Sequence, residues 1–291
     1  MKYNHDNISP LDSRYLNKIP EFRKNFSESA LIKIRFEIEI DWLVFLCTNL
    51  PSSFKPLSKE SINKIKNFKN KFDDKYVLKI KKIESVTNHD VKAVEYFIAE
   101  FFNKDKVLKK YVHLIHFGLT SEDINSLSYA CLIKKGTLLL LNETKEIQKT
   151  LKSYSKKWSK ISFLARTHGQ AASPSTLGKE FKVFSSRLER ELNLLKEIKP
   201  LAKFSGATGN FHTFQIVDDS VDWAKTNKKF LKQFGIEQNL YTTQIEPHDW
   251  IAEVSHSMIR INNILTDLSL DCWIYISNEI FKLKLNNLLF Y

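Results

Sequence analysis

The sequence predicts an all-α protein built around a few unusually long helices, and three observations support this fold class. Apolar residues recur at helical spacing over long stretches of the chain. Only 7 Gly and 7 Pro occur in 291 residues, which leaves few places for the tight turns of a many-stranded sheet. Several apolar stretches begin at a residue type that caps helices well. With 43% hydrophobic residues, the chain can bury a substantial core.

The first expected helices form a small N-terminal helical domain, residues 1–110. Between Ser27 and Pro51 the apolar residues keep a spacing of three or four, with Ser27 as the cap and Pro51 as the stop. A lysine-rich helix is expected after Ser58. A third helix is expected over residues 90–103, where apolar side chains again share one face.

The second expected domain, residues 111–291, is an incomplete central bundle of long helices. Thr120 with Asp123 resembles a capping box, and Ser173 before Pro174 offers a cap followed by proline at the first helical position. Helices this long bury their wide apolar stripes only against comparably long partners, so we expect an elongated antiparallel bundle completed by other subunits. The expected helices cover residues 121–160, 174–198, 220–234 and 247–285.

Composition limits the class of partner and the compartment. The net charge of +12 suits a polyanion, either a nucleic acid or a small phosphorylated, carboxylated substrate. Lysines are scattered and do not line one face, so we do not expect nucleic-acid binding. The polar first ten residues lack a secretory signal and no apolar run could cross a bilayer, so we expect a cytoplasmic protein without membrane contact. The cysteines, which lack metal-ligand spacing, are expected to be buried free thiols: Cys47, Cys131 and Cys272.

Six short polar segments each lie between an apolar run and a helix start. Free backbone donors and the positive end of a helix suit such segments to anions, although each one could also be a simple turn or cap. His168 is the strongest candidate for a catalytic residue, because Arg-Thr-His-Gly-Gln places a titratable ring beside a cation, a hydroxyl and an amide. The segments are residues 9–15, 87–90, 116–123, 166–176, 205–210 and 241–249.

Five stretches resemble, in order along the chain, the fumarase/aspartase superfamily and, more narrowly, the adenylosuccinate lyase family of the longer bacterial type. The stretch Thr-Asn-His-Asp-Val-Lys-Ala-Val-Glu-Tyr at 87–96 points to adenylosuccinate lyase, whereas Arg-Thr-His-Gly-Gln at 166–170 also admits other lyases of the superfamily. The remaining stretches are Ser-Pro-Leu-Asp-Ser-Arg-Tyr at 9–15, His-Phe-Gly-Leu-Thr-Ser-Glu-Asp at 116–123 and Tyr-Thr-Thr-Gln-Ile-Glu-Pro-His-Asp at 241–249.

The resemblance implies the helical fold of that superfamily and a carbon–nitrogen lyase without metal or organic cofactor. The implied reaction eliminates fumarate from adenylosuccinate, and from the succinylated aminoimidazole carboxamide ribotide of purine synthesis. His168 matches the family's general acid, and His89 matches a second catalytic histidine placed near the phosphate and leaving group. Substrate contacts are implied for Arg14, Tyr15, Asn88, His89, Asp90, His116, Thr120, Ser121 and Gln244.

The resemblance also leads to an expectation about the catalytic activity of the chain. The family's base is a serine in a loop of the form Ser-Ser-x-Met-Pro-x-Lys-x-Asn-Pro, and this sequence contains no such segment. We therefore expect the base and the C-terminal part of the fold to be absent, and the isolated chain to be weakly active or inactive. The family's enzymes are homotetramers with sites shared between subunits.

Three alternatives stay open. The chain could be a non-catalytic truncated remnant or the nucleotide-binding subunit of a split lyase. It could be another lyase of the superfamily, such as an argininosuccinate or fumarate enzyme, although the stretch at 87–96 disfavours this. A basic nucleic-acid-binding protein is the remaining interpretation, on charge alone.

Overall fold

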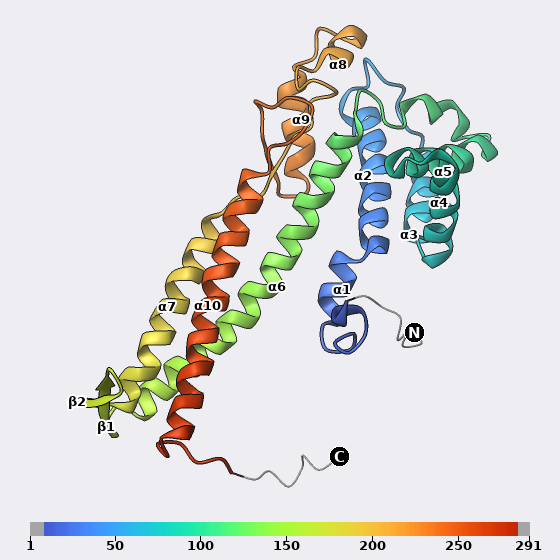
Figure 1. Ribbon diagram of the computed structural model, residues 1–291. Helices are drawn as coiled ribbons and strands as arrows, with labels where there is room; N and C mark the ends of the chain where they lie inside the picture. The colour runs from blue at the N-terminus through green and yellow to red at the C-terminus, as the bar shows by residue number, and fades with distance from the viewer. Residues whose placement is uncertain (1–8, 285–291) are drawn as a thin grey trace. The chain divides into compact units, whose positions relative to one another are not determined.

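The computed structural model describes residues 9–284, which are predominantly helical (Figure 1), and the predicted all-α class is confirmed. The chain divides into two compact units. Unit 1 contains the residues up to 136 together with 199–248, and unit 2 contains 137–198 and the residues from 249 onward. The expected domain boundary near residue 110 remains a prediction.

Unit 1 begins with the short 3-10 helix η1 (Pro10–Asp12) and is built around α2 (Glu28–Asn49). Ser27 caps α2 by accepting a hydrogen bond from the Ala30 amide at 3.2 Å, as its sequence position predicts. Buried residues occupy most of the circumference of α2, and only the face that carries Lys33, Glu37 and Asp41 has none, which is typical of a central helix. The other elements of unit 1 up to residue 120 are α1 (Pro20–Phe26), α3 (Lys59–Asn70), α4 (Asp74–Thr87), α5 (Asp90–Lys104) and η2 (Lys109–Leu114).

Aromatic side chains fill the core of unit 1. Trp42 of α2 packs edge-on against Phe204 and Phe230, with ring centroids 5.1 and 5.0 Å away. Its indole N–H donates to the Phe117 carbonyl at 2.9 Å, which satisfies the polar atom that this burial would otherwise strand. The unit is completed by β3 (Leu201–Ala202), α8 (His212–Val217), α9 (Trp223–Lys232) and β4 (Glu237–Gln238), with β3 and β4 parallel.

Helix α6 (Ser121–Lys157) begins in unit 1 and ends in unit 2, which also contains α7 (Leu177–Glu197) and α10 (Asp249–Ser277). In unit 2, Gln148 of α6 donates a hydrogen bond to Ser185 of α7 at 3.3 Å. Figure 1 shows α7 and α10 side by side along unit 2. Leu188 and Leu192 of α7 are buried, as is Ile261 of α10. The ion pair of Arg187 with Asp267, at 2.7 Å, also joins these two helices.

One predicted helix start is wrong. Ser173 and Pro174 do not open α7. They belong to β2 (Gln170–Thr176), which pairs antiparallel with β1 (Ser162–Thr167). Pro174 is tolerated because each strand of a two-stranded hairpin is an edge strand. The cap of α7 is Thr176, whose hydroxyl accepts from the Lys179 amide at 3.2 Å.

The other helix predictions are confirmed with shifted ends. The helices expected over 121–160, 220–234 and 247–285 are α6, α9 and α10, and α10 ends at Ser277; residue 285 lies outside the described part of the chain. Helices α1, α4 and α8 were not predicted.

Cys47 and Cys131 are buried free thiols as expected, whereas Cys272 is only half-buried. No helix among residues 9–284 combines the length and apolar content needed to cross a bilayer.

Candidate functional site

The junction between α4 and α5 places three of the predicted site residues in succession. Asn88 ends α4 with a left-handed backbone, at φ 50°, and His89 caps α5. The Nδ1 atom of His89 accepts a hydrogen bond from the Lys92 amide at 3.2 Å. In a neutral ring the proton must then be on Nε2, and Nε2 lies 3.4 Å from the hydroxyl of Ser121.

Asp90 is tied into the unit by a buried arginine. Its Oδ2 atom lies 2.7 Å from Nη2 of Arg35, whose side chain is only 5% exposed. Nε of the same arginine donates to Asn125 of α6 at 2.9 Å. Arg35 of α2 therefore connects the first residue of α5 to the first turns of α6.

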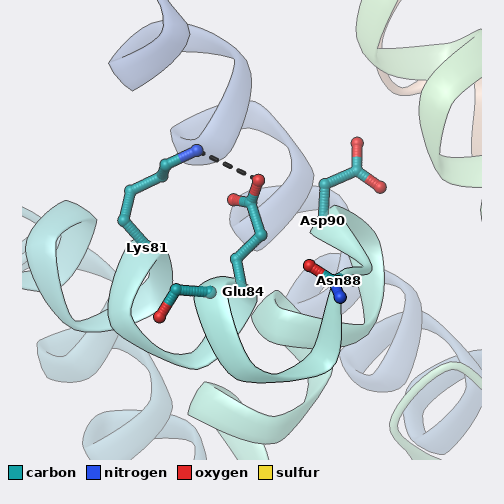
Figure 2. Close-up of a pocket in the computed structure, with 5 residues that line it drawn as sticks. Lys81, Glu84, Asn88 and Asp90 are labelled. Carbon is teal, nitrogen blue, oxygen red and sulfur yellow. Dashed lines mark hydrogen bonds and ion pairs between the residues drawn. The ribbon is translucent and has the colours of Figure 1, made fainter.

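Asn88 and Asp90 line a surface pocket of about 430 Å³ (Figure 2). Figure 2 shows them beside Lys81 and Glu84 of α4, which form an ion pair at 3.0 Å. The pocket thus offers an amide, two carboxylates and one ammonium group. Polar groups of both charge signs suit a small polar ligand better than an apolar one.

The start of α6 brings Thr120 and Ser121 to the same region of unit 1. The Thr120 amide donates to Oδ2 of Asp123 at 2.8 Å, which is one half of the predicted capping box. The contact of Ser121 with His89 places the starts of α5 and α6 close together. Two helix starts carry partial positive charge, which favours an anionic ligand.

His116 has a left-handed backbone, at φ 57°, and is clamped by Glu39 of α2. Oε1 of Glu39 lies 2.6 Å from Nδ1 of the ring, and Oε2 accepts the His116 backbone N–H at 3.1 Å. The Glu39 side chain is 0% exposed. Both of its oxygens are therefore used by one histidine.

A second carboxylate, Glu95 of α5, lies on the same side of the His116 ring. Its Oε1 atom is 3.7 Å from Nδ1 of His116, and its Oε2 atom is 2.6 Å from Nζ of Lys92. Burial alone would lower the pKa of His116, but attraction to Glu39 and Glu95 outweighs it and the pKa is raised. Burial has the opposite effect on a carboxyl group and raises the pKa of Glu95. The two carboxylates therefore stabilise the protonated form of the His116 ring relative to the neutral form.

Glu39, Glu95 and His116 are also the one group of potential metal ligands found among the described residues. The 2.6 Å separation of Glu39 Oε1 from His116 Nδ1 is a hydrogen-bond distance. Two ligands of one tetrahedral zinc ion lie roughly 3.3 Å apart, given metal–ligand bonds of about 2 Å. The arrangement fits a proton between the two atoms better than a metal ion.

A buried ion pair holds the segment at 205–210 against the start of α6. Asp123 and Lys203 have fully buried side chains, and Oδ1 of Asp123 lies 2.7 Å from Nζ of Lys203. The amides of Ser205 and Gly206 also donate to Asp123, at 2.8 and 3.2 Å. This carboxylate therefore organises two of the six polar segments at once.

The loop before α10 is arranged around Glu246. Oε2 of Glu246 accepts from the amide of His248 at 2.6 Å and lies 2.9 Å from its Nδ1. Gln244 is an exposed residue of this loop. Its neighbours Tyr241, Thr242, Thr243 and Ile245 help to line a pocket of about 440 Å³.

Arg14 and Tyr15 lie in the exposed segment after η1. The Arg14 guanidinium is 5.6 Å from the centroid of the Tyr15 ring, which is a cation–π contact. Tyr15 remains 39% exposed. Their placement against a ligand stays a prediction.

His168 lies in unit 2, at the tip of the β1–β2 hairpin. Thr167 pairs with Gln170, so His168 and Gly169 are the two turn residues, with φ 54° and 74°. Positive φ at both positions is typical of a type I′ turn, which matches the twist of the flanking strands. The turn holds the imidazole exposed at the end of unit 2.

Several residues of this site were missed in the sequence. Glu39 and Arg35 lie among apolar residues of α2, and a charge inside such a run is itself a signal of a paired buried group. Glu95 belongs to the stretch at 87–96, and His248 to the stretch at 241–249. Neither was singled out, because only the fold shows which partner each one faces.

Comparison with known proteins identifies the family. Residues 13–288 match the family described as "Lyase". The chain is 43% identical over 280 residues to "Adenylosuccinate lyase" of Legionella pneumophila (strain Corby), covering 95% of this chain and 61% of that protein. It is 38% identical over 279 residues to "Adenylosuccinate lyase" of Escherichia coli (strain K12), again covering 95% and 61%. The chain thus spans about three fifths of the length of these relatives.

Solved structures with low sequence identity share the fold. Fumarate lyase from Mesorhizobium sp. BNC1 superposes with a TM-score of 0.71 at 17% identity, over 89% of this chain and 58% of that one. The beta-carboxy-cis,cis-muconate cycloisomerase from Acinetobacter calcoaceticus sp. ADP1 gives 0.70 at 19% identity, over 88% and 57%. These two structures show the fold alone, whereas the family match over residues 13–288 shows that the chain belongs to the lyase family of the fumarase/aspartase superfamily.

Proposed function

We propose that the chain supplies the nucleotide-binding and proton-donating residues of an adenylosuccinate lyase. The observation that carries this proposal is the convergence of His89, Ser121 and Asp90 at the starts of α5 and α6, in a chain whose named relatives are adenylosuccinate lyases. Helix starts and histidines suit the phosphate and carboxylates of the substrate.

The proposed reaction breaks the carbon–nitrogen bond of the succinyl group. A base removes the proton from the carbon β to the departing nitrogen, the electrons form the double bond of fumarate, and the C–N pair leaves with nitrogen. His168, the proposed general acid, protonates that nitrogen, so AMP is released from adenylosuccinate. The succinylated carboxamide ribotide would react in the same way. No residue of this chain is assigned as the base.

In this proposal, the anion-binding groups stabilise the carbanion-like intermediate and hold the nucleotide. His89 presents Nε2–H beside Ser121, and Asn88 and Asp90 add polar contacts at the neighbouring pocket. The remaining substrate contacts are proposed to come from Arg14, Tyr15, His116, Thr120, Ser121 and Gln244. We also propose a cytoplasmic homotetramer whose sites combine residues from several subunits.

Fumarate release from adenylosuccinate by the 291-residue chain tests the proposal, with His168→Asn beside it. Asparagine tolerates the left-handed backbone at this position, so loss of activity would report the missing imidazole. We expect a decrease of about a hundredfold to ten-thousandfold. His256→Ala is the control, because His256 is an exposed histidine of α10 in the same unit.

Measurable turnover that is equal in the wild type and His168→Asn would contradict the role of His168. AMP binding without any fumarate release would contradict catalysis by this chain and favour the nucleotide-binding subunit. Faster release from argininosuccinate than from adenylosuccinate would favour another lyase of the superfamily.

A further inference from the structure

Glu39 is a fully buried carboxylate that serves a single residue. It lies in the middle of α2, its side chain is 0% exposed, and both of its oxygens hydrogen-bond His116. Burying an ionised carboxylate is costly unless hydrogen bonds replace its lost water. In this case both replacements come from a histidine whose backbone is in the left-handed region, at φ 57°.

Glu95 adds a second, incompletely satisfied carboxylate. The residue is 8% exposed, and its Oε1 atom has no hydrogen-bond partner among the described residues. That oxygen faces Nδ1 of His116 at 3.7 Å. The charged groups that face the ring are thus Glu39 from α2 and Glu95 with Lys92 from α5.

The contacts of His116 differ at its two nitrogens. Nδ1 is 2.6 Å from the Glu39 carboxylate, so this nitrogen carries a proton. The side chain is 13% exposed, and a ring hydrogen-bonded at Nδ1 has Nε2 left for a ligand. Two carboxylates beside Nδ1 stabilise a second proton, on Nε2, and this makes the ring a cationic donor.

We propose that Glu39 is a positioning residue, and that with Glu95 it holds His116 as an imidazolium whose Nε2–H binds an anionic oxygen of the ligand. The anion is a phosphate or carboxylate, because these groups accept charge-assisted hydrogen bonds. The assignment deepens the proposed function and rests on it only in taking His116 as a ligand-binding residue. Neither carboxylate touches the ligand in this scheme.

Nitrogen NMR of histidine-labelled protein tests the scheme without requiring turnover. The His116→Asn spectrum identifies the His116 signals among those of the 8 histidines. In the wild type we expect a proton on Nδ1 throughout the titration, and a pKa above about 6.5, the ordinary histidine value. In Glu39→Gln the pKa of His116 should decrease by roughly 1 to 3 pH units, because an adjacent negative charge is lost.

Glu37→Gln is the matched control, two residues away on the same helix, and should leave His116 unchanged. Glu95→Gln should lower the pKa of His116 by less than Glu39→Gln, since Glu95 lies farther from the ring. A wild-type ring without a proton on Nδ1 would overturn the scheme before any variant is made. Lower stability of Glu39→Gln with an unchanged His116 titration would show that Glu39 is only structural.

AMP binding by calorimetry separates this inference from the proposed function. If both are correct, Glu39→Gln should weaken AMP binding roughly tenfold, the effect of about 1.4 kcal/mol. If the wild type does not bind AMP, the proposed function fails, whereas the NMR titration still decides whether Glu39 positions His116. Wild-type affinity for AMP in a Glu39→Gln variant whose His116 pKa has fallen would contradict the ligand contact.

Discussion

Four residues of the candidate site segments have a left-handed backbone. Asn88, His116, His168 and His248 have φ values between 50° and 64°. Such backbones cost about 1–3 kcal/mol for residues other than glycine, and they persist where surrounding contacts hold them. Glu39 holds His116 and Glu246 holds His248. These side chains therefore project in directions that a regular helix or strand would not offer.

Gly118 tests how strictly the fold requires glycine at a position with positive φ. Its φ is 73°, and an added Cβ would lie 2.2 Å from the Phe214 ring. Gly118→Ala combines this overlap with backbone strain, so we expect a loss of roughly 2–4 kcal/mol of unfolding free energy. Urea unfolding followed by circular dichroism measures the loss.

Gly235→Ala is the control for Gly118→Ala in the same unit. Gly235 also has positive φ, but the nearest atom to its added Cβ is Nζ at the far end of the Lys134 side chain, which donates to the carbonyls of Phe234 and Gly235. A long side chain can shift more easily than a packed ring, so we expect a loss of about 1–2 kcal/mol, mainly from backbone strain. Equal losses in the two variants would show that Phe214 moves aside readily.

The start of α6 is organised at the element scale by one buried carboxylate. Asp123 accepts from Lys203 and from the amides of Thr120, Ser205 and Gly206. It thereby caps its own helix and holds a segment about 80 residues away in sequence. The side-chain contacts of Asp123 and Lys203 are unequal, since the Lys203 ammonium has only the Gly206 carbonyl as a further hydrogen-bond partner among the described residues.

These unequal contacts predict which residue of the pair contributes more to the unfolding free energy. Asp123→Ala leaves a buried ammonium with one carbonyl, and we expect it to lower the unfolding free energy by about 3–5 kcal/mol. Lys203→Met leaves a carboxylate that still accepts backbone hydrogen bonds, so its cost should be clearly smaller. Urea unfolding of both variants measures the difference, and a larger cost for Lys203→Met would refute the interpretation.

At the scale of the whole molecule, α10 carries apolar side chains that the described part of the chain leaves uncovered. Leu270, Trp273 and Ile274 are 56%, 70% and 52% exposed. Large apolar residues this close together on one helix form a patch of the kind that binds other proteins. The proposed homotetramer would cover this patch with helices of other subunits.

Trp273→Glu tests that assembly. We expect light scattering after size exclusion to show an oligomer for the wild type and a smaller species for Trp273→Glu, because a charge buried in the interface is costly. Ile216→Glu is the control, since Ile216 is 85% exposed on α8 and belongs to unit 1, whereas Trp273 belongs to unit 2. A monomeric wild type, or an oligomer unaffected by Trp273→Glu, would rule out this surface.

Most of the long helices could be predicted because their signals are local, whereas α1, α4 and α8 were missed. Ser27 and Ser58 cap α2 and α3 within three residues of themselves, and apolar periodicity needs only the neighbouring turns. The β1–β2 hairpin was missed since Ser173 before Pro174 satisfies the local rule for a helix start. Strand pairing between Leu164 and Pro174 overrides that rule.

The candidate site could also be predicted only in part from the sequence. Its histidines and polar segments could be recognised along the chain, because each is a short run of residues with known chemistry. Their partners could not: Glu39 lies 77 residues from His116, and Lys203 lies 80 residues from Asp123. A buried charge takes whichever opposite group the packed chain brings within about 3 Å of it, so these pairs exist only once the helices are packed.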